Sequence, residues 1–366
     1  DNFEDIHSKL EFLLTEKLGD IGKKIHTGRS RNDQVLVATQ LYLKNEILII
    51  KKLIKKLFDI LISLAEKNKT KLIPGYTHLQ IAMPSSFGIW FSSYAEILID
   101  DIIYLNTAYK INNQNPLGSA AGYGTSLNID REYTTKELGF ETLKFNVASA
   151  QMSRGRSEKS VAIAIGSVAE TLARLCSDIC LYMTKELNFI SINQEISTGS
   201  SIMPHKKNPD IFELVRAKCN NIKGLTNQLN MISTNLSSGY QRDMQLVKGK
   251  IIDGIESIKD CIEITSFALK KINSSSSNKA EHRELESMLE IASPDNSKGH
   301  CASIYRMSNF RKPEAFRDSV WQSLCSELRE LMKEGRDSND PVLMELAWSN
   351  LNLLDRIAEG NVPWTF

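Results

Sequence analysis

Long stretches of helical periodicity constrain this chain more than any other feature. Over residues 33–68, apolar side chains recur every three, four or seven positions between lysines, which predicts one amphipathic helix. The same periodicity covers residues 84–112, 157–183, 210–234 and 245–272. Helices of about 25 to 35 residues are roughly 40 to 50 Å long at 1.5 Å per residue. The sequence therefore predicts an all-α fold, a bundle of long helices.

The composition changes after residue 272. Residues 1–272 hold 26 Lys and 8 Arg, whereas residues 273–366 hold 4 Lys and 7 Arg and begin with a run of serines. We therefore predict a helical-bundle domain at 1–272, a Ser-rich linker at 273–279 and a tail of unknown function at 280–366. Amphipathic patterns predict two helices in this short helical C-terminal tail, at 314–334 and 341–359.

Composition also excludes several classes of protein. The chain has 366 residues, of which 42% are hydrophobic and 24% charged, and 45 Lys and Arg balance 44 Asp and Glu. This excludes disorder and non-specific nucleic-acid binding. No apolar run reaches the roughly 20 residues that cross a bilayer, and no secretory signal begins the chain, which predicts a cytoplasmic protein. Because the sequence does not begin with Met, we expect that the start is cut.

Metal and cofactor motifs are absent from the sequence. The six cysteines form no Cys-x-x-Cys pair and the six histidines no i,i+4 pair, so we expect reduced thiols and no metal. No P-loop or dinucleotide-binding glycine pattern is present, so no nucleotide cofactor is expected.

The connector at 198–210 holds the densest group of reactive side chains. Lys206 and Asn208 could clamp a carboxylate, and Ser200 could serve as a base if nearby cations stabilise its alkoxide. A solvated Ser-rich loop is the alternative reading of the same composition.

Three other connectors carry polar groups. His78 lies in a polar turn at 74–80 and could transfer protons, although a lone histidine is more often structural. The segment 27–34 suits carboxylate recognition by arginine, or it is a helix start capped by Asn32 or Asp33. The segment 237–248 adds Tyr240 and Gln245, a weak signal alone.

Together these connectors resemble the argininosuccinate lyase branch of the fumarase/aspartase superfamily. The stretch Gly-Ser-Ser-Ile-Met-Pro-x-Lys-x-Asn at 199–208 resembles the superfamily signature. The stretches His-Thr-Gly-Arg-Ser-Arg-Asn-Asp-Gln-Val at 26–35 and Pro-Gly-Tyr-Thr-His-Leu-Gln at 74–80 resemble the argininosuccinate branch, as does Tyr-x-Arg-Asp-Met-Gln at 240–245. The resemblance covers about residues 1–272.

The resemblance implies a fold and a reaction. Family members are cytosolic, mostly helical homotetramers in which three chains contribute to each active site. The implied reaction is an anti β-elimination that splits argininosuccinate into arginine and fumarate, a step of arginine biosynthesis that uses no metal or organic cofactor.

The resemblance also implies residue roles. Ser200 would remove the Cβ proton, and Lys206 and Asn208 would hold the charge that develops on the substrate carboxylate. His78, oriented by Glu213, would assist protonation of the leaving nitrogen. The matching substrate-carboxylate contacts are Ser30, Arg31, Asn32 and Thr77. The groups that match the arginine-binding end are Tyr240, Gln245 and Lys248.

Some features depart from the family pattern. We expect the chain to start past the N-terminal segment that closes on substrate, and an unrelated tail replaces the usual C-terminal domain. The stretch 146–156 and His205 differ from common family residues, although Arg154 falls at a matching arginine. Two alternatives stay open: a superfamily lyase for an adenylosuccinate-type substrate, and a non-catalytic protein that reuses the bundle.

Overall fold

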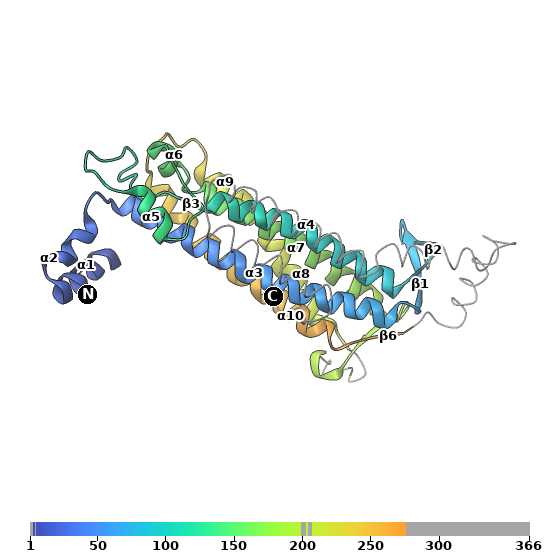
Figure 1. Cartoon of the computed structure of the whole chain (residues 1–366). Coiled ribbons are helices and arrows are strands. Elements are labelled where there is room, and N and C mark those ends of the chain that lie inside the picture. The colour runs from blue at the N-terminus through green and yellow to red at the C-terminus, as the bar shows by residue number, and fades with distance from the viewer. Residues whose placement is uncertain (1–2, 4, 199–202, 204–206, 276–366) are drawn as a thin grey trace, which may run out of the picture. The chain divides into compact units, whose positions relative to one another are not determined.

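The computed structural model describes residue 3 and residues 5–198, 203 and 207–275 (Figure 1). The chain divides into two compact units. The first holds the helices up to residue 73 and again from residue 86. The described part of the second is the segment Pro74–Ser85.

Four long helices form the core of the first unit: α3 (Arg31–Asn68), α4 (Phe87–Asn112), α7 (Arg156–Tyr182) and α10 (Gln245–Leu269). Figure 1 shows them side by side, and α3 packs on α4, α4 on α7, and α10 on both α3 and α7. The 38 residues of α3 span about 57 Å at 1.5 Å per residue. The predicted all-α bundle of long helices is confirmed.

The buried face of α3 shows why this segment is a helix. Its fully buried side chains recur at helical spacing, and burying each of them contributes about 1.5 to 3 kcal/mol. They include Leu43, Ile47, Ile50, Ile54, Leu57 and Leu61.

The predicted helix at 210–234 is two helices, α8 (Asp210–Lys223) and α9 (Leu225–Ser233). Gly224 separates them and is the weakest helix former in the stretch. Both helices pack on α7 and α10.

Helix α7 is apolar and long enough to cross a membrane by length and composition alone. In the structure 61% of its most apolar window is buried in the bundle, where it contacts α4, α8 and α10. It is therefore the central core helix of the first unit.

Short elements connect the long ones. The short helices are α1 (Ile6–Leu18), α2 (Asp20–Lys23), η1 (Lys24–His26), α5 (Arg131–Glu137), α6 (Val147–Met152), η2 (Gln194–Ile196) and η3 (Arg242–Met244). The strands are β1 (Leu72–Thr77), β2 (Gln80–Ser86), β3 (Gln114–Asn115), β4 (Thr142–Leu143), β5 (Ile190–Ile192) and β6 (Ile272–Ser274). Strand β1 pairs with β2, β3 runs parallel to β4, and β5 antiparallel to β6.

Two predicted helix boundaries differ from the structure. The helix predicted from residue 84 begins at Phe87, because Pro84 lies in β2 and the Ser86 hydroxyl accepts a hydrogen bond from the Ile89 N–H at 3.3 Å. The last helix ends at Leu269, before β6.

Strand β6 also contains Asn273 and Ser274, the first two residues of the predicted linker. The ammonium group of Lys71 donates to the Ser274 carbonyl at 2.7 Å and ties this strand to the end of α3. The remaining linker residues and both predicted tail helices lie outside the described residues, so the division into domain, linker and tail stays a prediction.

Candidate active site

A capping box fixes the start of α3. The Ser30 hydroxyl accepts a hydrogen bond from the Asn32 N–H at 3.2 Å, and the Asp33 carboxylate accepts one from the Ser30 N–H at 2.9 Å. The expectation of a capped helix start is confirmed, but the cap is Ser30 rather than Asn32 or Asp33. The predicted substrate contacts Ser30, Arg31 and Asn32 therefore occupy the first turn of α3.

Asp33 also fastens the segment that follows α4. Its Oδ2 accepts hydrogen bonds from the backbone N–H groups of Gly118 at 3.0 Å and Ala120 at 2.9 Å, and the side chain is fully buried. Sequence reasoning treated Asp33 only as a possible cap. The Ser-x-x-Asp spacing of Ser30 and Asp33 is a local signal that could have indicated the capping box, but no local signal indicates the contact with Gly118, 85 residues away.

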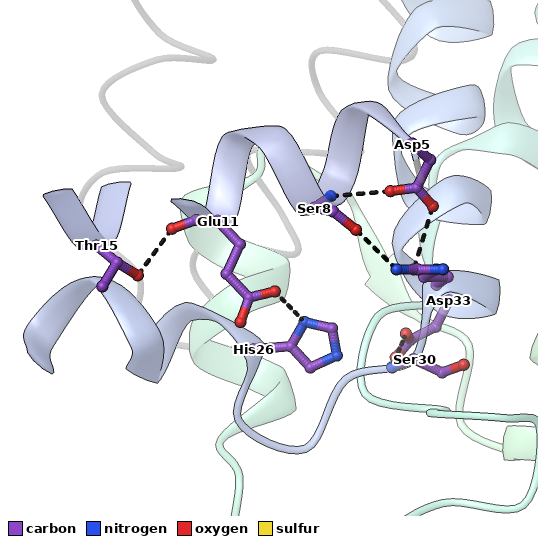
Figure 2. A network of polar contacts seen from close by, with 8 residues as sticks. Asp5, Ser8, Glu11, Thr15, His26, Ser30 and Asp33 are labelled. Atoms are coloured by element: carbon purple, nitrogen blue, oxygen red, sulfur yellow. Dashed lines mark hydrogen bonds and ion pairs between the residues drawn. The ribbon is translucent and has the colours of Figure 1, made fainter. Parts of the chain in front are cut away.

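The side chain of Arg31 contacts α1. Its Nε lies 3.2 Å from Oδ2 of Asp5, and its Nη2 donates to the Ser8 hydroxyl at 2.8 Å. Figure 2 shows this network, in which His26 also pairs with Glu11 through Nδ1 and Oε2 at 3.2 Å. The Ser8 N–H, together with Arg31, holds the pKa of the Asp5 carboxyl below its ordinary value. The sequence pattern gave no signal for either α1 partner.

The residues predicted to bind the arginine end lie close together. Gln245 donates from Nε2 to the Tyr240 hydroxyl at 3.1 Å, and Lys248 is exposed one turn further along α10. The guanidinium of Arg154 lies 5.1 Å from the centre of the Tyr240 ring, in cation–π contact. Arg154 thus joins this group.

Tight backbone packing joins the connectors around Tyr240. Gly155 has a φ of 81°, and a Cβ there would lie 2.9 Å from the sulfur of Met244. Gly239 has a φ of 91°, and a Cβ there would lie 3.3 Å from the Tyr123 hydroxyl. The connectors before α3, after α4, before α7 and before α10 therefore meet at one end of the first unit.

Asn208 and Glu213 lie elsewhere in the first unit. They line a cavity of about 790 Å³ together with Arg216 and residues at the C-terminal end of α7, such as Ser177 and Cys180. Arg154 lies just before the N-terminal end of α7. From Arg156 to Ser177 the helix rises about 32 Å. Within one chain, Asn208 and Glu213 therefore lie far from Tyr240 and Gln245.

Thr77 and His78 belong to the second unit. The turn predicted at 74–80 is a hairpin, in which β1 ends at Thr77 and β2 begins at Gln80. His78 and Leu79 form its tip with φ of 54° and 60°, a left-handed pair typical of two-residue hairpin turns. Both side chains are exposed. The pairing of His78 with Glu213 stays a prediction.

Ser200 and Lys206 lie outside the described residues. The residues that flank them form a β-bridge, in which the Asn208 N–H donates to the Thr198 carbonyl at 3.1 Å. Within the described ranges, no group of three or more His, Cys, Asp and Glu side chains could hold a metal ion.

The connector groups suit recognition of a polar anion. Arg31, Arg154 and Lys248 carry positive charge, and the amide and hydroxyl of Gln245 and Tyr240 add donors and acceptors at the same end of the unit. Such groups bind carboxylates through charge-assisted hydrogen bonds. The described groups can therefore hold a carboxylate-bearing ligand.

Sequence relatives are argininosuccinate lyases. An argininosuccinate lyase of Phocaeicola vulgatus is 51% identical over 272 residues, which cover 74% of this chain and 61% of the relative. One of Bacteroides fragilis is 50% identical over 269 residues, covering 74% and 60%. The chain thus spans about 60% of the length of these relatives.

A solved structure is similar in fold, and a family model matches more than half of the chain. A structure described as fumarate lyase:delta crystallin from Brucella melitensis is similar with a TM-score of 0.66 at 19% identity, covering 83% of this chain and 71% of that one. At this identity the similarity concerns the fold alone. Residues 2–224, more than half of the chain, match the family described as lyase. By this match, and in agreement with the resemblance of its connectors, the chain belongs to the lyase family.

Proposed function

We propose that this chain catalyses the argininosuccinate lyase reaction, in which argininosuccinate yields arginine and fumarate. The observation that carries the proposal is the identity of about 50% to argininosuccinate lyases over some 270 residues. Since the chain spans only about 60% of those relatives, the activity of this chain is itself part of the proposal.

The proposed chemistry is an elimination. Ser200 takes the Cβ proton of the succinyl group, and the electron pair moves onto the adjacent carboxylate. Lys206 and Asn208 stabilise this charge where it develops. The C–N bond then breaks, its electrons leave with the guanidino nitrogen, and His78 assists the protonation of that nitrogen. The residues need no cofactor for these steps.

The remaining predicted residues hold the two ends of the substrate. Ser30, Arg31, Asn32 and Thr77 are proposed to bind its succinyl carboxylates. Tyr240, Gln245 and Lys248 are proposed to bind the arginine end. The hydrogen bond between Tyr240 and Gln245 supports this second group acting as one unit.

We also propose a cytoplasmic homotetramer with active sites shared between chains. The separation of Asn208 and Glu213 from Tyr240 and Gln245 supports it, because α7 alone places about 32 Å between the two groups. A single substrate molecule cannot contact both groups of one chain. In the proposed assembly, another copy of the chain supplies one of them.

Fumarate release tests the proposal. The purified chain is given argininosuccinate and the ultraviolet absorbance of fumarate is followed, with Ser200→Ala as the control and adenylosuccinate as the second substrate. We expect fumarate from argininosuccinate with the wild type and none with Ser200→Ala. A folded wild-type protein that releases no fumarate contradicts the proposal, and release from adenylosuccinate instead favours the alternative substrate.

A further inference from the structure

Helix α1 lies on the surface of the first unit. None of its residues is buried, and its apolar side chains Ile6, Leu10 and Phe12 are about half exposed or more. Polar side chains connect it to the start of α3 and to η1: Asp5 and Ser8 contact Arg31, and Glu11 contacts His26 (Figure 2). Hydrophobic packing of α1 therefore does not account for where these polar groups lie.

The contacts that fix the backbone of Arg31 are not the contacts that hold its side chain. The capping box of Ser30 and Asp33 fixes the helix start, and Asp33 is anchored in turn by Gly118 and Ala120. These bonds do not reach the guanidinium, whose side chain is 43% exposed. A free arginine side chain samples many rotamers and loses that freedom on binding.

Among the described residues, Asp5 and Ser8 at the start of α1 contact this guanidinium. The Asp5 carboxylate contacts Nε and the Ser8 hydroxyl contacts Nη2, at 3.2 and 2.8 Å. Because a guanidinium is planar, contacts at two of its nitrogens set the direction of the whole plane. Asp5 has a second role, since its Oδ1 accepts the Ser8 N–H at 2.8 Å and caps α1. The same carboxylate therefore starts the helix and orients Arg31.

We propose that Asp5 and Ser8 are positioning residues that hold the Arg31 guanidinium ready to receive a substrate carboxylate. The inference rests on the proposed function, which assigns Arg31 to that carboxylate. Preorganisation of a cation in this way strengthens binding because less conformational entropy is lost.

A competing role makes the opposite prediction. If the Asp5 carboxylate merely occupied the place of a substrate carboxylate, removing its charge would tighten substrate binding. Positioning predicts weaker binding after the same change.

Three variants separate these roles. Asp5→Asn keeps a side chain that caps a helix equally well but removes the charge next to Arg31. Ser8→Ala removes the hydroxyl on Nη2. Asp20→Asn is the matched control, because Asp20 pairs only locally with Lys23 in the exposed short helix α2.

The first readout is substrate affinity. For Asp5→Asn and Ser8→Ala we expect KM for argininosuccinate to rise about tenfold, with kcat within about twofold and unchanged helix content by circular dichroism. Asp5→Glu restores part of the loss, and Asp20→Asn behaves as the wild type. An unchanged or lowered KM in Asp5→Asn overturns the inference while leaving the proposed function in place.

The second readout does not depend on activity. The Nε–Hε resonance of Arg31, assigned by its loss in Arg31→Lys, reports how well the guanidinium is held. We expect a slowly exchanging signal in the wild type that exchanges faster in Asp5→Asn. A signal unaffected by Asp5→Asn overturns the positioning role whether or not the wild type releases fumarate. Absence of fumarate from a wild type with an ordered Arg31 contradicts the proposed function instead.

Discussion

The Asp33 carboxylate lies 3.0 Å from the backbone nitrogen of Gly118 and so joins the first turn of α3 to the segment after α4. The same carboxylate accepts from the N–H groups of Ser30 and Ala120. Three backbone donors therefore depend on one buried acidic side chain. This contact holds together the connectors that carry the candidate active site.

Asp33→Asn is expected to destabilise the protein. The amide group places a donor against backbone N–H groups, and the lost bonds to a charged acceptor lower the free energy of unfolding by about 2 to 3 kcal/mol. Urea denaturation followed by circular dichroism measures it. Asp59→Asn is the control, because Asp59 forms only an exposed pair with Lys55, and a loss under about 0.5 kcal/mol is expected there. Equal midpoints for the two variants would contradict the structural role of Asp33.

Two glycines associated with α7 are expected to respond oppositely to alanine. At Gly155 the φ of 81° is unfavourable for alanine and the new Cβ meets Met244, so the free energy of unfolding falls by about 1 to 3 kcal/mol. At Gly166, inside the same helix, a Cβ meets nothing within 4 Å, so Gly166→Ala gains about 0.5 to 1 kcal/mol. Thermal and urea denaturation of both variants test this, and two changes of the same sign would contradict it.

Asp101 is expected to make stability depend on pH. Burial raises the pKa of its carboxyl above the ordinary 3.8, although the hydroxyls of Ser167 and Thr171 donate to it at 2.6 and 2.7 Å. The folded protein therefore keeps this proton to a higher pH than the unfolded chain. Its contribution to stability is greatest below pH 3.8 and declines as the pH rises towards the raised pKa, by about 1.4 kcal/mol for each unit between the two pKa values.

The comparison with Asp101→Asn isolates this effect. The free energy of unfolding is measured from pH 3.5 to 7 for both proteins, and we expect the wild type to lose stability relative to the variant as the pH rises. Asp253→Asn, at an exposed position on α10 away from Asp101, controls for the loss of one carboxylate. Parallel pH profiles for wild type and Asp101→Asn would show that the buried carboxyl has no such role.

Elements whose buried residues recur in a local pattern can be predicted from the sequence. Helix α3 was predicted to within two residues because its buried leucines and isoleucines recur at helical spacing. Strand β6 was not predicted, because Ser274 looks like linker by composition and its partner Ile190 is 84 residues away. The hairpin tip at His78 was predicted as a turn, but proline and glycine in β1 concealed the strands on either side.

In the candidate site, too, contacts between residues that are near in sequence can be predicted, whereas contacts between separate elements cannot. Tyr240 and Gln245 are five residues apart, so a local pattern could indicate that they act together. The contacts of Arg31 with Asp5 and of Asp33 with Gly118 join separate elements and depend on tertiary structure. The distance between Asn208 and Tyr240 depends on the packing of α7 and α8, which a list of motifs in sequence order does not contain.

Tyr240 and Gln245 are expected to act as one unit in substrate binding. Tyr240→Phe removes the hydroxyl that accepts from Gln245, and Gln245→Ala removes the donor, so each change alone disrupts the same contact. Under the proposed function, each raises KM for argininosuccinate, and the double variant loses less than the sum of the two, with a coupling energy of about 1 kcal/mol. Steady-state kinetics of the four proteins give this value.

The control cycle combines Tyr240→Phe with Lys250→Ala. Lys250 lies near Gln245 on α10, but its ammonium group donates to Gln228 on α9. Since the Lys250 ammonium group contacts Gln228 and not Tyr240, these two changes should add within about 0.5 kcal/mol. Additivity in both cycles would mean that the hydrogen bond between Tyr240 and Gln245 does not contribute to binding. Coupling only in the first would assign the arginine end of the substrate to this pair.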